Sequence, residues 1–247
     1  MKHTNQSINI ILALTILFAS MLSCNIGQTE KRTTLFNQYY IIEPSTLLGL
    51  LKNGDMNAFS PVNESPGLLP VEQQIPVNWL QADYLYIANM LYKGFLGKTL
   101  QGWQLSSMDF SLGCSDIQNG FQNGRFTFFK VVKEKEQESR IVRPIDIDPR
   151  GNFVHTTEWE YYPNLVNLEI IDLAKLKISA DLAHQIAESN GGEEKRELVE
   201  NACNISVGLY PNSSSYKGWE VSYTRKDDRT SFFHIQIDPY TGEIHFP

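Results

Sequence analysis

The sequence predicts an α+β protein in which two tandem modules, each a helix packed on an antiparallel β-sheet, follow a signal segment and a linker. One observation is a repeated sequence motif, since Trp103 and Trp219 are each followed further along the chain by the residues Ile-x-Ile-Asp-Pro. The other is that a segment with helical spacing of apolar residues precedes each copy. A repeated supersecondary unit defines the architecture. The expected segments are 1–23 for the signal, 24–75 for the linker, 76–173 for the first module and 174–247 for the second.

The N-terminal segment has the pattern of an export signal. Residues 8–22 form an apolar run that is short for a membrane span and suited to a signal peptide. It ends in Leu22-Ser23-Cys24, and a small residue before a cysteine resembles a bacterial lipoprotein signal, although Met21 stands where Leu is usual. That resemblance implies lipidation of Cys24 and an extracytoplasmic protein anchored to a bacterial membrane. An ordinary signal peptide and an uncleaved anchor are the alternatives.

Charge and cysteine content limit the classes of function. The net charge of −7 gives no general electrostatic reason to bind nucleic acid or anionic lipid. Beyond Cys24 the chain has Cys114 and Cys203, one in each expected module. Export permits a disulfide between them, and two separate buried thiols are the alternative.

The linker and the first module have weaker signals than the second module. Four prolines between residues 61 and 76 predict that the linker holds no long regular element, apart from one or two helical turns at 47–51. The first module opens with a helix capped by Asn78. A strand around Trp103, two Asn-Gly turns, and strands at 125–132 and 140–148 follow it.

The second module has clear element boundaries. Ser179 is a candidate N-cap for a helix that ends at residues 190–192. The strands expected after it are 205–209, 219–225, 231–238 and 243–246. Asp238, Pro239 and Gly242 form a tight turn, because the carboxylate accepts from turn amides and glycine takes the left-handed corner. Asp148 and Pro149 are expected to make a similar turn in the first module.

These residues carry a family resemblance. Residues 183–187 with Gly191-Gly192, then 219–221, then Ile-Asp-Pro-Tyr-Thr-Gly-Glu-Ile at 237–244, resemble a PepSY domain. The resemblance implies a helix-on-sheet module outside the cytoplasm that binds a protein or peptide or inhibits a peptidase. The first module shares Trp103 and the Asp148-Pro149 turn, and it is therefore interpreted as a divergent copy.

The search for catalytic residues favours a protein that is not an enzyme. The chain has no Gly-x-Ser-x-Gly, His-Glu-x-x-His or phosphate-binding glycine motif. His184 and Glu188 are spaced to share a metal, and a solvated helix face explains them equally. Asp146 and Asp148 share one strand face and are expected to be solvated. We therefore expect no cofactor and no metal.

Trp103 and Trp219 are expected to pack under their helices as core. The alternative is an exposed aromatic surface on the sheet, near Tyr223 and Phe232, that binds a peptide partner. The leading hypothesis is a membrane-anchored lipoprotein that binds a protein or peptide in the envelope and regulates a secreted peptidase. A structural component of an envelope assembly is the second hypothesis, and a metal-dependent hydrolase is the third.

Overall fold

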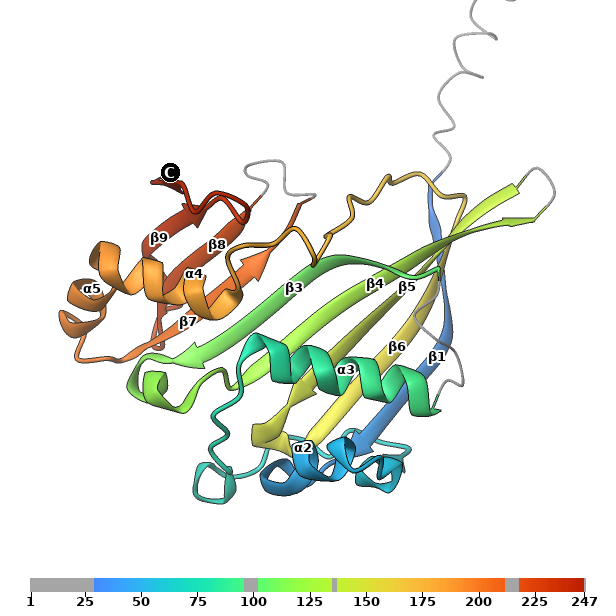
Figure 1. Ribbon diagram of the computed structural model, residues 1–247, viewed down its shortest axis with the longest axis horizontal. Helices are drawn as coiled ribbons and strands as arrows, with labels where there is room; N and C mark the ends of the chain where they lie inside the picture. The colour runs from blue at the N-terminus through green and yellow to red at the C-terminus, as the bar shows by residue number, and fades with distance from the viewer. Residues whose placement is uncertain (1–28, 96–101, 135–136, 212–217, 247) are drawn as a thin grey trace, which may run out of the picture.

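One continuous antiparallel sheet organises the molecule. The computed structural model describes residues 29–95, 102–134, 137–211 and 218–246. In these residues, ten strands form a single sheet in the order β10-β9-β8-β7-β3-β4-β5-β6-β1-β2 (Figure 1). The strands are β1 Lys31–Ile41, β2 Ser60–Val62, β3 Gln104–Gly113, β4 Asn123–Glu134, β5 Gln137–Asp148, β6 Phe153–Tyr162, β7 Cys203–Leu209, β8 Trp219–Arg225, β9 Ser231–Ile237 and β10 Ile244–His245. The α+β class is therefore confirmed.

The helices cover one face of this sheet (Figure 1). They are α2 Pro44–Lys52, α3 Gln81–Phe95, α4 Ala180–Ala187 and α5 Glu193–Glu197, with a π-helical turn, η5, at Glu188–Gly192 between the last two. The short 3-10 turns are η1 Met56–Ala58, η2 Val71–Gln73, η3 Cys114–Asn119 and η4 Pro149–Gly151. The alternating strand pattern turns the apolar residues toward the helices, so that one hydrophobic core runs under both α3 and α4.

The two halves of the sheet meet at β3 and β7. These strands pair from Met108↔Leu209 to Gly113↔Asn204. On either side the sheet runs outward in chain order, as β3-β4-β5-β6 one way and β7-β8-β9-β10 the other. In chain order, α3 is followed by β3 to β6, and α4 and α5 are followed by β7 to β10, while β1 and β2 extend the first half beyond β6.

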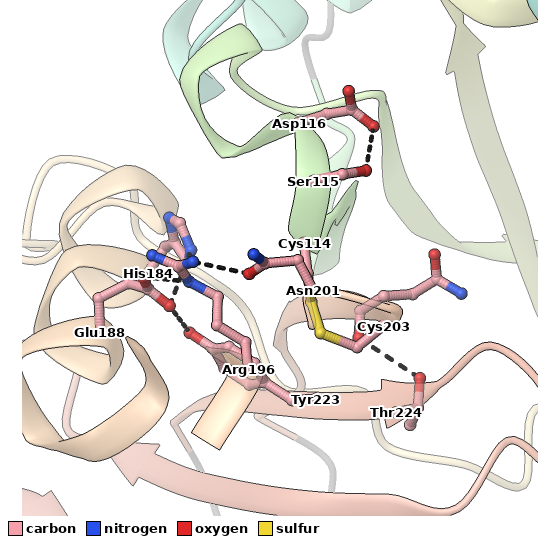
Figure 2. The surroundings of a disulfide bond; sticks show 11 residues. Cys114, Ser115, Asp116, His184, Glu188, Arg196, Asn201, Cys203, Tyr223 and Thr224 are labelled. Carbon is pink, nitrogen blue, oxygen red and sulfur yellow. Dashed lines mark hydrogen bonds and ion pairs between the residues drawn. A yellow bond between two sulfur atoms is a disulfide. The ribbon is translucent and has the colours of Figure 1, made fainter. Parts of the chain in front are cut away.

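A disulfide and two helix ends join the halves. Cys114, directly after β3, is bonded to Cys203 at the start of β7, with 5.3 Å between their Cα atoms (Figure 2). The backbone N–H of Gln81 donates to the Asp181 carboxylate at 3.4 Å, and the Gln81 side chain accepts from the N–H of Ala180 at 2.6 Å. Since the first N–H groups of a helix lack internal partners, α3 and α4 satisfy each other's N-termini.

The prediction of a linker over residues 24–75 is wrong for the larger part of that segment. Strand β1 pairs with β6 along its whole length and also with β2, and α2 buries Leu47 and Leu51. The helical turns predicted at 47–51 lie inside α2. Pro44 opens α2 and the other prolines of this segment begin at Pro61, while residues 33–42 are rich in Thr, Tyr, Phe and Ile, which favour strands.

The repeated tryptophans do not occupy equivalent places. Trp103 lies just before β3, the first strand after its helix, whereas Trp219 opens β8, the second strand after its helix. Trp219 pairs with Ile237, and in the other half Gly124 pairs with Ile147. The Asp-Pro turns are equivalent, since each follows the third strand of its half. Gly124 is therefore the counterpart of Trp219.

The predicted signal segment and Cys24 lie outside the described residues. Within the described residues, the longest apolar helices are too short or too polar to cross a membrane.

Candidate functional site

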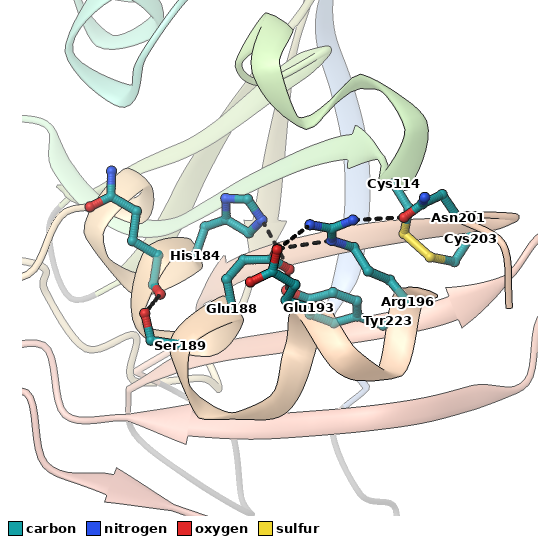
Figure 3. Close-up of polar contacts among 10 residues, drawn as sticks. Cys114, His184, Glu188, Ser189, Glu193, Arg196, Asn201, Cys203 and Tyr223 are labelled. Carbon is teal, nitrogen blue, oxygen red and sulfur yellow. Dashed lines mark hydrogen bonds and ion pairs between the residues drawn. A yellow bond between two sulfur atoms is a disulfide. The ribbon is translucent and has the colours of Figure 1, made fainter. Parts of the chain in front are cut away.

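A polar cluster lies between α4, α5 and the sheet. Glu188, directly after α4, accepts a hydrogen bond from the Tyr223 hydroxyl at 2.6 Å and from Nε of Arg196 at 2.8 Å (Figure 3). Nε2 of His184 lies 3.9 Å from the same carboxylate, and Arg196 also donates to Asn201 at 2.8 Å. The π-helical turn η5 brings Arg196 back over Glu188, eight residues earlier in the chain.

Burial favours the neutral forms of Tyr223 and His184 in this cluster. Burial raises the pKa of Tyr223, and its hydrogen bond to Glu188 raises that pKa further. Burial lowers the pKa of His184, while the Glu188 charge acts in the opposite direction. Nε2 of His184 is buried and has no hydrogen-bond partner among the described residues. A tyrosine hydroxyl with a raised pKa is not an activated nucleophile.

The spacing of His184 and Glu188 brings the two side chains together, as expected for residues four apart on a helix. In the part of the chain that the structure describes, no group of three or more His, Cys, Asp or Glu side chains is arranged to hold a metal ion. The partner roles of Arg196 and Tyr223 were missed, because Tyr223 comes from a strand 35 residues away.

The expected core packing of Trp219 is confirmed, and the alternative of an exposed aromatic surface is wrong for Trp219 and Tyr223. Both side chains are fully buried, and Nε1 of Trp219 donates to the carbonyl of Ile178 at 2.9 Å. The signal that could have shown this is the helix above, where Ala180, Ala183 and Ala187 leave room for large rings.

Trp103 and Phe232 are partly exposed and far less enclosed. Trp103 packs edge-on against Tyr92, with ring centroids 5.7 Å apart, and Lys130 lies over its ring at 4.9 Å. Phe232 packs edge-on against Tyr223 at 6.4 Å. They lie in different halves, so the four aromatics do not form one surface.

Both Asp-Pro turns have the hydrogen bonds predicted from their residue types. Oδ1 of Asp238 accepts from the backbone N–H of Tyr240 at 2.8 Å and of Thr241 at 2.7 Å, and Gly242 has a φ of 80°. Pro239 is buried between them. In the first half, Oδ1 of Asp148 accepts from Arg150 N–H at 3.0 Å within η4, which begins at the buried Pro149.

The outer edge of β9 is open over most of its length. Strand β10 pairs only with Ile237 and Gln236, so residues 231–235 have no partner strand on that side among the described residues. The N–H of Asp238 points outward, to Glu243 at 2.8 Å. Because main-chain groups alternate along an antiparallel strand, those of His234 also point outward. An extended peptide could pair with this edge.

Comparison with known proteins finds a family match for the second half of the sheet. Residues 177–244 match the family model of PepSY, the peptidase propeptide and YPEB domain. The C-terminal resemblance is confirmed, and the protein contains a PepSY domain that spans α4 to the start of β10.

Other comparisons add no functional assignment. No curated protein matches the chain. A crystal structure of HtdX from Mycobacterium tuberculosis is aligned over 81% of this chain and 96% of that one, at 10% identity, but its TM-score of 0.18 is too low to support an argument.

Proposed function

We propose that the protein is a non-enzymatic, lipid-anchored extracytoplasmic protein that binds a protein or peptide and restrains a secreted peptidase. The observation that carries this proposal is the PepSY match over residues 177–244, because the family is described by its occurrence in peptidase propeptides. The first half is a divergent PepSY-like copy in this proposal, supported by its matching order of helix, strands and Asp-Pro turn.

The open edge of β9 is the proposed contact for the partner. It lies inside the PepSY segment, and its outward main-chain groups offer hydrogen bonds to an extended chain whatever that chain's sequence. Such pairing suits a propeptide-like role, since a peptidase also holds extended chains in its cleft.

The test is inhibition of peptidases secreted by the same cells, with two variants at one position. His234→Pro removes an outward N–H, which an edge strand tolerates, whereas His234→Ala removes only the side chain. We expect His234→Pro to weaken inhibition at least tenfold and His234→Ala to leave it nearly unchanged, with both variants melting like the wild type. Equal losses in the two variants would place recognition in the side chain, and no inhibition by the wild type would exclude a peptidase as the partner.

Anchoring is tested separately, by labelling cells with an alkyne fatty acid. Wild-type protein should carry the label and sediment with membranes, while Cys24→Ser should lose the label and appear in the soluble fraction. An unlabelled wild-type protein would contradict the lipid anchor without affecting the peptidase proposal.

A further inference from the structure

A row of polar side chains crosses the face of the sheet that the helices leave uncovered. Its members are paired neighbours on five strands: Tyr39, His155, Asp146, Arg125 and Asp109. The Tyr39 ring stacks on His155 at 4.0 Å, and Nε of Arg125 lies 2.9 Å from Asp146. We call these five residues the transverse row.

The transverse row borders a cavity of about 380 Å³ in the first half of the sheet. Asp148 and Phe153, on the neighbouring positions of β5 and β6, close its other side. The interpretation of Asp146 and Asp148 as charges in open water is therefore wrong, since both carboxylates line a cavity. The cavity is within the size range of small-ligand sites.

The charges around this cavity do not balance. Asp146 is paired with Arg125, and Asp148 is paired with Arg150 at 2.9 Å. Asp109 forms no ion pair with any described residue, and its direct partner is the neutral hydroxyl of Tyr210. The three carboxylates thus face two guanidinium groups, of which only Arg125 lines the cavity, and Nδ1 of His155 lies 3.5 Å from Asp146.

Asp109 is held in place by the neighbouring strand. Gly208 faces it across the β3–β7 pair, and a side chain at that position would overlap the ring of Tyr210. The missing side chain lets Tyr210 fold back and donate to Asp109. Burial raises the pKa of Asp109 to about 6, Arg125 lowers that pKa, and Asp146 raises it. A carboxylate with a perturbed pKa in a cavity and no counter-charge in contact is costly for stability, which is typical of a binding site.

We propose that this cavity binds a primary ammonium group on a short alkyl chain, with Asp109 as its counter-ion. The ammonium supplies the missing positive charge, and its three donors suit a carboxylate that accepts from only one described group. Tyr39 and Phe153, with ring centroids 6.0 Å apart, form an aromatic wall at the opposite end of the cavity, three to four strands away from Asp109. The ammonium can come from a lysine side chain of a peptide or from a free diamine.

The test is calorimetric titration of the full-length protein with cadaverine and with a blocked Ala-Ala-Lys-Ala-Ala peptide. We expect saturable 1:1 binding of at least one probe, and no binding of the peptide after acetylation of its lysine. Binding of cadaverine alone assigns the site to free amines, and binding of the peptide assigns it to lysine side chains. The proposal is overturned if neither probe saturates or if the acetylated peptide binds equally well.

Variants assign the binding to the cavity. Asp109→Asn should weaken binding at least tenfold, whereas Tyr39→Leu, four strands away from Asp109, should change it by less than threefold. Asp227→Asn, in the turn between β8 and β9, makes the same charge change away from the cavity and should bind like the wild type. Wild-type affinity in a folded Asp109→Asn variant would overturn the proposal, and so would equal losses in Asp109→Asn and Asp227→Asn. The result is independent of peptidase inhibition, which concerns the β9 edge.

Discussion

In each half of the sheet, a large side chain and a small residue pack together between the helix and the strand below it. The two halves differ in which element supplies the large side chain. In the second half the strand supplies the large side chain, Trp219, and the helix supplies the small one, Ala183. In the first half the helix supplies Tyr84, and the strand has Gly124, where a Cβ would lie 2.8 Å from the Tyr84 ring. Tyr84 and Ala183 occupy the same turn of their helices, since each N–H bonds to the residue that precedes the helix. The comparison teaches that a fold can be kept while the residue that marks it moves to another element.

The largest expected effect on stability comes from removing the buried indole ring of Trp219 in the second half. Trp219→Ala should lower the free energy of unfolding by about 3–5 kcal/mol, because it leaves a cavity and an unpaired Ile178 carbonyl. Trp103→Ala is the matched control, and we expect a loss of about 1–2 kcal/mol because its ring is partly exposed. Guanidinium unfolding measures both. Equal losses would mean that the two tryptophans are equivalent after all.

The next largest effect is the pH dependence of stability that comes from Asp109, the buried acid of the first half. The folded-state pKa of Asp109 is about 6 against a usual value of 3.8, so the folded protein binds the proton more tightly than the unfolded chain. Stability is therefore greatest below about pH 4 and falls as the pH rises through about 6, by at most about 3 kcal/mol. Asp109→Asn should remove this part of the pH dependence. The difference in melting temperature between variant and wild type, measured from pH 4 to pH 8, checks the sign, and a difference that does not change with pH contradicts it.

A smaller effect tests whether Tyr84 and Gly124 really compensate each other. Gly124→Ala should cost about 1–3 kcal/mol, because the added methyl group meets the Tyr84 ring. In a Tyr84→Ala background the same change should cost much less, since the ring is gone. A double-mutant cycle measures this coupling. Additive effects would show that the two positions do not share one volume.

The smallest effect concerns the buried base of the second half and has the opposite sign to Asp109. Because burial lowers the pKa of His184, the unfolded chain binds its proton more readily than the folded protein. Stability due to His184 is present above about pH 6.5 and is lost as the pH falls below it. His184→Gln should reduce this loss on the acid side. Thermal unfolding at pH 5 and pH 7 measures it, and an unchanged acid sensitivity would assign the effect to other groups.

Local patterns predicted much of the second half, because its boundaries are set by neighbouring residues. The hydroxyl of Ser179 caps α4 by accepting from Leu182 N–H at 3.2 Å, and Asp238 forms the predicted turn. The β3–β7 pair could not be predicted, since no local pattern states which strands become neighbours across about 95 residues. The repeat suggested separate modules, whereas the strand order joins both halves in one sheet.

The contacts of the candidate sites also divide into those that local spacing predicts and those that depend on the tertiary fold. The adjacency of His184 and Glu188 follows from helical spacing and was visible in the sequence. Their partner Tyr223, and the contact of Tyr210 with Asp109 across 101 residues, depend on the tertiary fold. A cavity carboxylate without a counter-charge can be recognised only when the strands on both sides are in place.

The Cys114–Cys203 bond also decides how the protein carries a mechanical load. A pull between the two ends of the chain passes along β1 to β3, across the sulfur–sulfur bond, and on through β7 to β9. The 89-residue stretch between the cysteines lies off this path and cannot be drawn out. At about 3.5 Å per residue, roughly 300 Å of contour length remains locked under tension until the bond is reduced. Stretching in the presence and absence of a reductant would then differ by that extension.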